Sequence, residues 1–192
     1  MHTFQNQIRK DRYIYLFLFV NILMVTNKAF SQNKLEKEYR LPDNEIPTKA
    51  IAFVDSLVFQ DKIKWYKEIG EQEESIEAKT CKDHQKYSIE FDTKGRLQDI
   101  EIEKDWKKIT DSVREKIASY LHTVFEKHKI RKIQIQYSGT NKNLWLLLTK
   151  QIKSAPHQIK YEMIVKGSSA KEKELYEMLF SENGLESITL IV

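Results

Sequence analysis

Residues 87–95 read Tyr-Ser-Ile-Glu-Phe-Asp-Thr-Lys-Gly, and residues 176–184 read Tyr-Glu-Met-Leu-Phe-Ser-Glu-Asn-Gly. In both stretches the first, third and fifth residues are aromatic or aliphatic, which is the period of a strand with one buried face. Each stretch ends on a glycine, Gly95 or Gly184, where a tight hairpin needs a positive φ. The two stretches therefore predict a strand-and-turn unit that occurs twice in the chain.

A helix is expected ahead of the first stretch. Pro47 suits the first turn of this helix, which should end near Gln60. Its apolar stripe at helical spacing consists of Ile51, Val54 and Val58.

A second helix, ahead of the second stretch, has the clearest amphipathic stripe in the chain. Thr110 is placed to cap its start. The basic residues 127–129 suit the negative end of a helix dipole, so the helix should extend to them. The stripe consists of Val113, Ile117, Tyr120, Leu121, Val124 and Phe125.

Four extended segments follow each helix, which divides the chain into repeat one, 46–108, and repeat two, 109–192. Each repeat is a helix followed by a four-stranded antiparallel meander, and it is too small to bury its own apolar face comfortably. We therefore expect an α+β fold in which two tandem repeats form one eight-stranded sheet, with both helices packed on one face.

Repeat two carries an insertion, residues 138–157, between its first two strands. The segment Leu144-Trp145-Leu146-Leu147-Leu148 has no alternation, so a strand covered on both faces and a buried helical turn both explain it. The turn-rich residues 138–141 favour a hairpin with residues 130–137. Periodicity alone leaves strand and helix open for residues 144–152.

Residues 1–31 have the features of a signal peptide. A basic segment, residues 9–12, precedes an apolar run of about a dozen residues, and small side chains predict cleavage after Ser31. We expect a periplasmic or secreted protein without stable membrane insertion after cleavage. An uncleaved anchor is the alternative, but a membrane-spanning helix needs about 20 apolar residues. Residues 32–45 are polar and aperiodic, which predicts a disordered lead-in.

The leader holds four basic residues and one acidic residue, so it accounts for most of the net charge of +4. Residues 32–192 carry a net charge of +1, which gives no electrostatic reason to expect nucleic-acid binding. The scarcity of Gly, Pro and Cys excludes collagen-like, low-complexity and disulfide-scaffold proteins.

The chain contains no phosphate-binding loop, zinc-spaced Cys/His set or nucleophile elbow, so we expect neither catalysis nor a cofactor. Cys81 and His84 fall in a predicted turn without an orienting carboxylate. His122 and His128 are six residues apart on the predicted second helix, which puts them on different faces and disfavours a shared metal ion.

These features resemble the PepSY-like proteins, also called β-lactamase-inhibitor-like proteins, over residues 46–192. The matching elements are a helix, a strand with Trp65, the segment Glu77-Ala78-Lys79, the run from Tyr87 to Leu97 and a second helix. The resemblance implies an exported module of tandem helix-plus-meander repeats whose exposed sheet face binds another protein. The true inhibitors of this family carry a disulfide in each repeat, which a chain with one cysteine cannot form.

Strand alternation predicts which residues face away from the helices. In the first repeat these include Ser88, Glu90 and Asp92, which make this face charged. In the second repeat three apolar residues on neighbouring strands share it, and we expect them to form a partner-binding patch. The expected patch consists of Ile164, Leu179 and Ile191, flanked by Lys160 and Glu162, with Trp145 as a further contact. Alternatively, the inserted segment folds over these residues as a small second core.

We therefore expect an exported, non-enzymatic protein-binding module, inhibitor-like or chaperone-like towards another envelope protein. The main alternative is a carrier of a small ligand or lipid, with a pocket between the sheet and residues 138–157. An enzyme is the third possibility, and it would require Cys81, His84 and a carboxylate to meet in a cleft.

Overall fold

The computed structural model describes residues 32–34, 37–59, 61–70, 74–151, 158–168 and 173–191. The chain divides into two compact units, Met1–Phe30 and Ser31–Val192, and the described residues all belong to the second. The predicted signal peptide and part of the 138–157 insertion lie outside the described residues.

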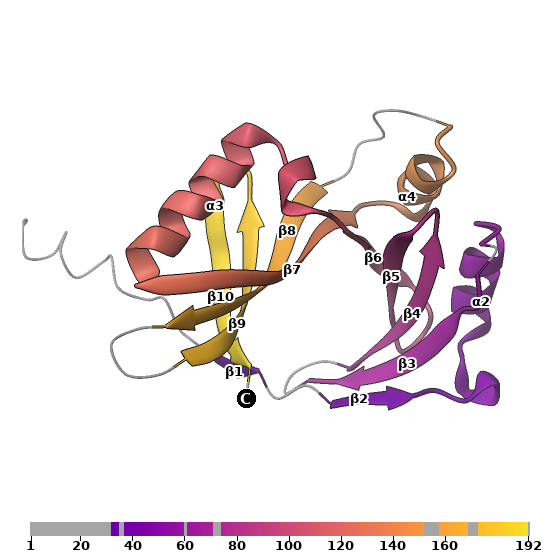
Figure 1. The fold of residues 1–192 in the computed structure, drawn as a ribbon. Helices are drawn as coiled ribbons and strands as arrows, with labels where there is room; N and C mark the ends of the chain where they lie inside the picture. The colour runs from indigo at the N-terminus through magenta and orange to yellow at the C-terminus, as the bar shows by residue number, and fades with distance from the viewer. Residues whose placement is uncertain are drawn as a thin grey trace, which may run out of the picture. The chain divides into compact units, whose positions relative to one another are not determined.

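Two helices each precede four strands in the chain (Figure 1). The first set is α2 (Thr48–Asp55), β3 (Lys64–Ile69), β4 (Glu74–Lys82), β5 (Gln85–Asp92) and β6 (Leu97–Glu103). The second set is α3 (Asp111–Val124), β7 (Lys127–Ser138), β8 (Gln158–Ser168), β9 (Lys173–Ser181) and β10 (Gly184–Ile191). A short helix, α4 (Asn141–Leu148), lies between β7 and β8, and short 3₁₀ turns cover Asp43–Glu45 and Trp106–Lys108. None of the helices in the described part of the chain has the length and apolar content that a membrane span requires.

All the strands join one sheet in the order β1-β10-β9-β8-β7-β6-β5-β4-β3-β2. The pairs from β2 to β10 are antiparallel, and β1 (Gln32–Lys34) adds to β10 in parallel. The predicted α+β class is therefore confirmed. The β6–β7 pair joins the two sets of strands, so the sheet continues without a break through the middle of the molecule.

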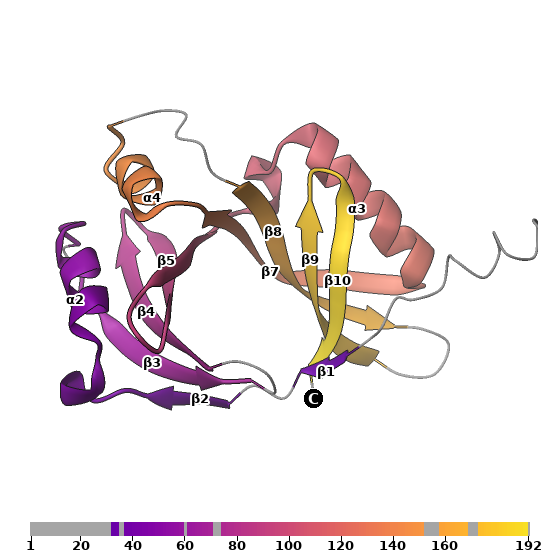
Figure 2. The same cartoon turned by 180° about the vertical axis from the view of Figure 1, so that it is seen from behind.

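The predicted disordered lead-in, residues 32–45, is wrong where the structure describes it. β2 (Lys37–Arg40) pairs with β3, and Leu41 is buried in the core. An edge strand is held by backbone hydrogen bonds, which need no apolar periodicity in the sequence. β1 and β2 lie at opposite ends of the sheet order, yet only two residues separate them in the chain. The Cα atoms of Lys34 and Lys37 are therefore at most about 11 Å apart, which requires the sheet to bend. Figures 1 and 2 show this bend.

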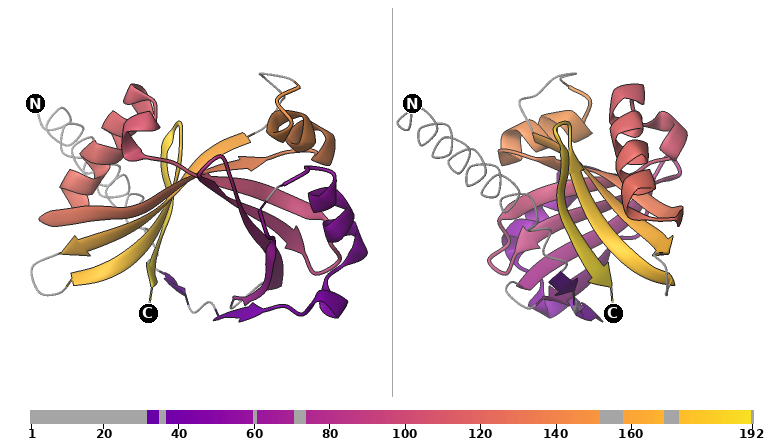
Figure 3. Two further views of the ribbon diagram at one scale, coloured as in Figure 1. Left: turned by 45° about the vertical axis from the view of Figure 1, so that its right-hand side comes forward. Right: turned by 90° about the vertical axis from the view of Figure 1, so that its left-hand side faces the viewer.

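The helices α2 and α3 each pack against a core cluster of their own. Figure 3 shows the two helices beside different parts of the sheet. In the first cluster Phe53 of α2 meets Phe91 of β5 edge-on, with ring centroids 6.0 Å apart at an interplanar angle of 73°. In the second, Tyr120 of α3 meets Phe180 of β9 at 5.7 Å and 79°. Such edge-to-face pairs stabilise cores beyond their buried area.

Where β6 meets β7, the two clusters approach the same side of the sheet. The register pairs Ile102, which is in the first cluster, with Ile135, which packs against the second. Residues directly opposite each other on neighbouring strands project to the same side. We call the other side of the sheet the open face.

Both helices end earlier than the sequence indicated. α2 stops at Asp55, and Val58 is exposed with a φ of 52° instead of lying on the buried stripe. α3 stops at Val124, so residues 127–129 begin β7 and do not cap a helix. Phe125 ends α3 because its backbone is extended and its buried ring packs in the second cluster, which turns the chain into the sheet.

The hairpin favoured for the 138–157 insertion is wrong, because α4 occupies residues 141–148 and β7 pairs with β8. Thr140 begins this helix by accepting a hydrogen bond from the backbone N–H of Asn143. Leu144 is fully buried in the first core cluster, with Trp145 and Leu148 packed against it. The helical alternative is therefore correct for this segment.

Both turn glycines have the predicted left-handed backbone, with φ of 75° at Gly95 and 129° at Gly184. Gly95 is also confined sterically, because a Cβ there would lie 2.8 Å from that of Pro47. The turn after β5 therefore contacts the start of α2.

Candidate functional site

The open face carries charged side chains, as predicted from Glu90 and Asp92, but it is not uniformly solvated. Glu77 and Glu101 project to it from β4 and β6 and are only 4% and 5% exposed. Ser88 between them is also buried. Carboxylates at this depth are rare in proteins unless they are paired or protonated, so this face requires a physical explanation.

The explanation begins with the curvature of the sheet. One cavity of about 330 Å³, which we call the acidic cavity, is lined by residues of all eight strands from β3 to β10. In a flat sheet these outer strands would be about 34 Å apart. Its lining consists of Glu68, Gly70, Ser75, Glu90, Gln98, Asp99, Glu101, Gln136, Glu162, Glu177, Leu179 and Ser187. This set contains six carboxylates and no lysine or arginine.

Three of these carboxylates come so close that their oxygens lie within 4.8 Å of one another. They belong to Glu90, Asp99 and Glu101, and the register pairs Glu90 directly with Asp99. Burial, together with the charges of Glu162 and Glu68, raises the pKa of Asp99 to about 7, although Lys160 opposes this shift.

Burial also raises the pKa of Glu90 and of Glu101 well above the ordinary range, and neighbouring carboxylates add to the effect. Glu101 shares a hydrogen bond with Glu162, which requires a proton on one of the two groups. The cavity is therefore able to hold protons near neutral pH and to release them when a positive group enters.

The hydrogen bonding of Asp99 is incomplete. The side-chain amide of Gln136 donates to Oδ2 at 3.3 Å. Oδ1 is buried and has no hydrogen-bond partner among the described residues. Leaving a buried acceptor unbonded costs about 1–3 kcal/mol, which a donor entering the cavity could offset.

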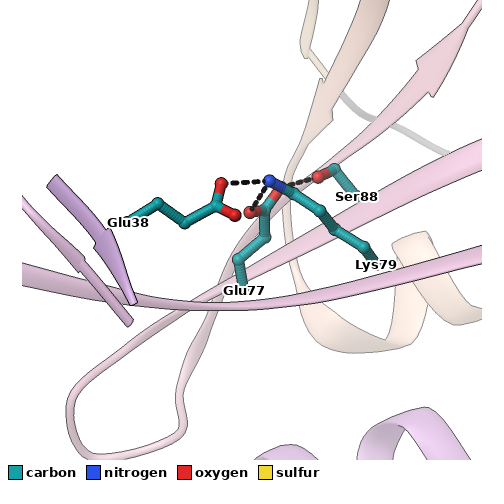
Figure 4. Close-up of polar contacts among 4 residues, drawn as sticks. All are labelled: Glu38, Glu77, Lys79 and Ser88. Atoms are coloured by element: carbon teal, nitrogen blue, oxygen red, sulfur yellow. Dashed lines mark hydrogen bonds and ion pairs between the residues drawn. The ribbon is translucent and has the colours of Figure 1, made fainter. Parts of the chain in front are cut away.

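A second group of carboxylates on the open face is already paired with a lysine (Figure 4). Lys79 Nζ lies 2.7 Å from Glu77 Oε2 and 2.5 Å from Glu38 Oε2, and Ser88 donates to the other oxygen of Glu77. Burial lowers the pKa of Lys79, but the hydrogen bonds to Glu38 and Glu77 outweigh it and raise the pKa overall. The contrast with the acidic cavity is clear, because no lysine lines that cavity.

The expected apolar patch does reach the open face but is interrupted there. Ile164 pairs with Glu177, and Leu179 pairs with Glu162, so each apolar side chain has a carboxylate beside it. Ile191 lies nearer the sheet edge, opposite Leu175. Each of the three is half-buried.

The residues expected around this patch differ in their surroundings. Lys160 forms an ion pair with Glu186 at 2.7 Å, and Glu162 lines the acidic cavity. Trp145 packs against the first core cluster, which lies on the other face of the sheet, so it is not part of the open face. For the same reason the segment Leu144–Leu148 does not cover Ile164 and its neighbours.

The predicted separation of the two histidines is wrong. His122 lies on α3 but His128 lies on β7, and their ring centroids are 5.0 Å apart. Burial and the neighbouring His122 lower the pKa of His128. The error follows from the predicted helix end, since a continuous helix would have separated these rings.

Sequence reasoning missed Glu68, Asp99 and Glu101 as members of a common cavity. Each occupies an outward position of its strand, and outward carboxylates usually indicate a solvated face. The recurrence of carboxylates at outward positions on most of the strands could have indicated a shared acidic surface. No single strand contains this pattern.

Comparison with known proteins adds one structural likeness. No family model matches the chain, and a search of curated proteins gave no match. The fold is similar to the 1.62 Å crystal structure of a DUF2874 family protein from Bacteroides ovatus ATCC 8483, with a TM-score of 0.50 and 10% sequence identity. The match covers 75% of this chain and 86% of the other. At this identity the likeness concerns the fold alone.

Proposed function

We propose that this protein is an exported, non-enzymatic protein-binding module, and that its open face binds a basic segment of another envelope protein. The observation that carries the proposal is the acidic cavity, in which six carboxylates from five strands surround a space of about 330 Å³ without a lysine or arginine. Complementary charge is the feature by which a surface of this kind selects its partner.

The energetics favour a cationic occupant. Burying carboxylates together is unfavourable, and the raised pKa values of Glu90, Asp99 and Glu101 express that cost. A lysine or arginine side chain entering the cavity would relieve the repulsion and donate to the unbonded Oδ1 of Asp99. The arrangement of Lys79 between Glu38 and Glu77 is an example within the same chain of how a cation is held on this face.

We also propose that the module consists of two PepSY-like tandem repeats with both helices on one face. Support comes from matching contacts at matching positions. Tyr87 of β5 packs on Phe59, which follows α2, with centroids 5.6 Å apart. Tyr176 of β9 packs on Phe125, which follows α3, at 5.0 Å. These tyrosines are the first residues of the two similar sequence stretches.

The alternative of a carrier with a pocket beside the 138–157 insertion has less support. α4 buries Leu144 in the first core cluster, so this part of the insertion contributes to packing. Neither of the two cavities on the open face is lined by a residue of α4.

Peptide binding to matched variants tests the proposed function. The probe is a fluorescent, extended peptide of alternating lysine and serine, and its dissociation constant is measured by anisotropy. The double variant Glu68→Gln plus Glu162→Gln should weaken binding by about tenfold. The control, Glu115→Gln plus Glu126→Gln, removes two exposed carboxylates outside the cavity and should change it by less than about twofold.

A peptide with glutamate in place of lysine should not bind. Equal losses in the two double variants would show that only the net charge matters, and equal binding of the two peptides would show no charge selection. Either result contradicts the proposal.

A further inference from the structure

A second cavity, of about 340 Å³, opens at the other end of the same strands, and we call it the lysine pocket. Its lining consists of Asp61, Lys62, Lys64, Lys79, Thr80, Cys81, Lys86, Tyr87, Ser88, Glu103, Lys132 and Gln134. Five lysines face two carboxylates in this set, the reverse of the acidic cavity. The volume falls within the range of small-molecule sites.

The lysines of this pocket divide into two groups. Lys79 is held by Glu38 and Glu77, and Lys86 lies 3.1 Å from Glu103. The other three, Lys62, Lys64 and Lys132, form no ion pair with any described residue. Lys62 precedes β3, Lys64 begins it and Lys132 lies on β7, so positive charge from distant parts of the chain converges on a pocket whose lysines outnumber its carboxylates.

The inner wall of the pocket combines apolar and polar surface. The lysine stems supply aliphatic surface, while Ser88 supplies a hydroxyl-bearing residue on the same face. A pocket of this kind suits a small molecule with an anionic head and an apolar body.

We propose that the lysine pocket binds a small organic anion, with its carboxylate or phosphate oxygens held by Lys62, Lys64 and Lys132 and its apolar part against the aliphatic stems of the lysines. This inference goes beyond the proposed function, because the acidic cavity and a basic protein segment play no part in it. An oxyanion relieves the repulsion among three unpaired ammonium groups, which is the physical reason for its binding.

Calorimetric titration tests the proposal directly, with benzoate, phenyl phosphate, inorganic phosphate and uncharged benzyl alcohol as probes. At least one aromatic anion should bind with a dissociation constant below about 1 mM, and benzyl alcohol should bind at least about tenfold more weakly. The ratio of benzoate to phenyl phosphate affinity distinguishes a carboxylate from a phosphate ligand. If inorganic phosphate binds as tightly as either aromatic anion, the proposal that apolar surface of the pocket contributes to binding is wrong.

A matched pair of triple variants locates the binding. Lys62→Gln, Lys64→Gln and Lys132→Gln together should weaken anion binding by at least about tenfold. The control changes three lysines that do not line the pocket, Lys94→Gln, Lys107→Gln and Lys173→Gln, and should weaken it by less than about twofold. Equal weakening by the two triple variants would overturn the proposal, as would no anion binding up to about 10 mM.

Cys81 gives a second readout, because it lines the pocket and is the sole cysteine of the chain. Positive potential attracts anionic iodoacetate but not neutral iodoacetamide, so the ratio of their alkylation rates reports the field at this thiol. The pocket variant should lower this ratio by at least about threefold relative to the control variant. An unchanged ratio would show that these lysines create no field in the pocket.

Discussion

Glu90 and Asp99 face each other across the β5–β6 pair, with carboxylate oxygens within 4.8 Å. Like charges directly opposite on neighbouring strands are destabilising. The curvature of the sheet adds Glu68 from β3 and Glu162 from β8 to the same surroundings, and both raise the pKa of Asp99. The bend of the sheet that buries the carboxylates of Glu90 and Asp99 therefore also forms the cavity in which we propose that a cation binds.

Replacing Asp99 by asparagine should stabilise the protein above pH 7. The pKa of Asp99 is about 7 in the folded chain and near its ordinary value of 3.8 in the unfolded chain, so the unfolded state ionises first as pH rises. Asp99 thus reduces stability progressively from about pH 4 to about pH 7 and has no such effect below that window. The gain for Asp99→Asn should be roughly 1–3 kcal/mol at pH 8, measured by urea denaturation.

The matched control for that experiment is Asp105→Asn, because this carboxylate is exposed and paired with Lys108. It should leave the pH dependence unchanged. The quantity to compare is the gain in unfolding free energy of Asp99→Asn over the unchanged protein. If this gain is no larger at pH 8 than at pH 4, the buried repulsion does not exist.

Replacing Lys79 by methionine should destabilise the protein by about 1–3 kcal/mol. The change removes the cation that lies between Glu38 and the buried Glu77. Adding Glu77→Gln to this variant should restore most of the loss, because no buried charge then remains at this position. Thermal unfolding of the single and double variants measures this coupling, and simple additivity of the two changes would contradict it.

Gly167→Ala should destabilise the protein by about 1–3 kcal/mol. A Cβ at this position of β8 would overlap the ring of Phe125, which is buried at the end of α3. The smaller side chain of Phe125→Leu should make the same glycine change less costly. Urea denaturation of the unchanged protein, the two single variants and the double variant tests this contact. The contact is absent if Gly167→Ala lowers the unfolding free energy equally with Phe125 and with leucine at position 125.

Export of the full chain from a bacterial host should remove residues 1–31. The basic segment, apolar run and small residues before the predicted cleavage point are the basis for this expectation. Intact-mass measurement of the protein from the periplasmic or culture fraction should give a chain that begins at Gln32. Full-length protein retained in the membrane fraction would instead support the anchor alternative.

Local patterns predicted the parts of the fold that depend on side-chain period. The alternation of Tyr87, Ile89 and Phe91 identified both β5 and its buried face, and Gly95 identified the turn. Helix ends were predicted poorly, because Phe125 ends α3 through tertiary packing and not through a capping signal. β2 was missed because an edge strand is specified by its neighbour's backbone.

The acidic cavity could not be predicted from any one strand. Glu68 and Asp99 are three strands apart in the sheet, and their interaction depends on how far the sheet bends. That bend is a property of the whole sheet. The outward carboxylates were visible in the sequence, but their depth of burial was not.

Proton release on peptide binding tests the central claim most directly. Titrating the lysine–serine peptide by calorimetry at about pH 6.5, in two buffers with different ionisation enthalpies, gives the number of protons exchanged. We predict a net release of protons that disappears above about pH 8, together with tighter binding as pH rises through about 7. Binding with no proton release, or binding that weakens as pH rises through this range, would contradict the account.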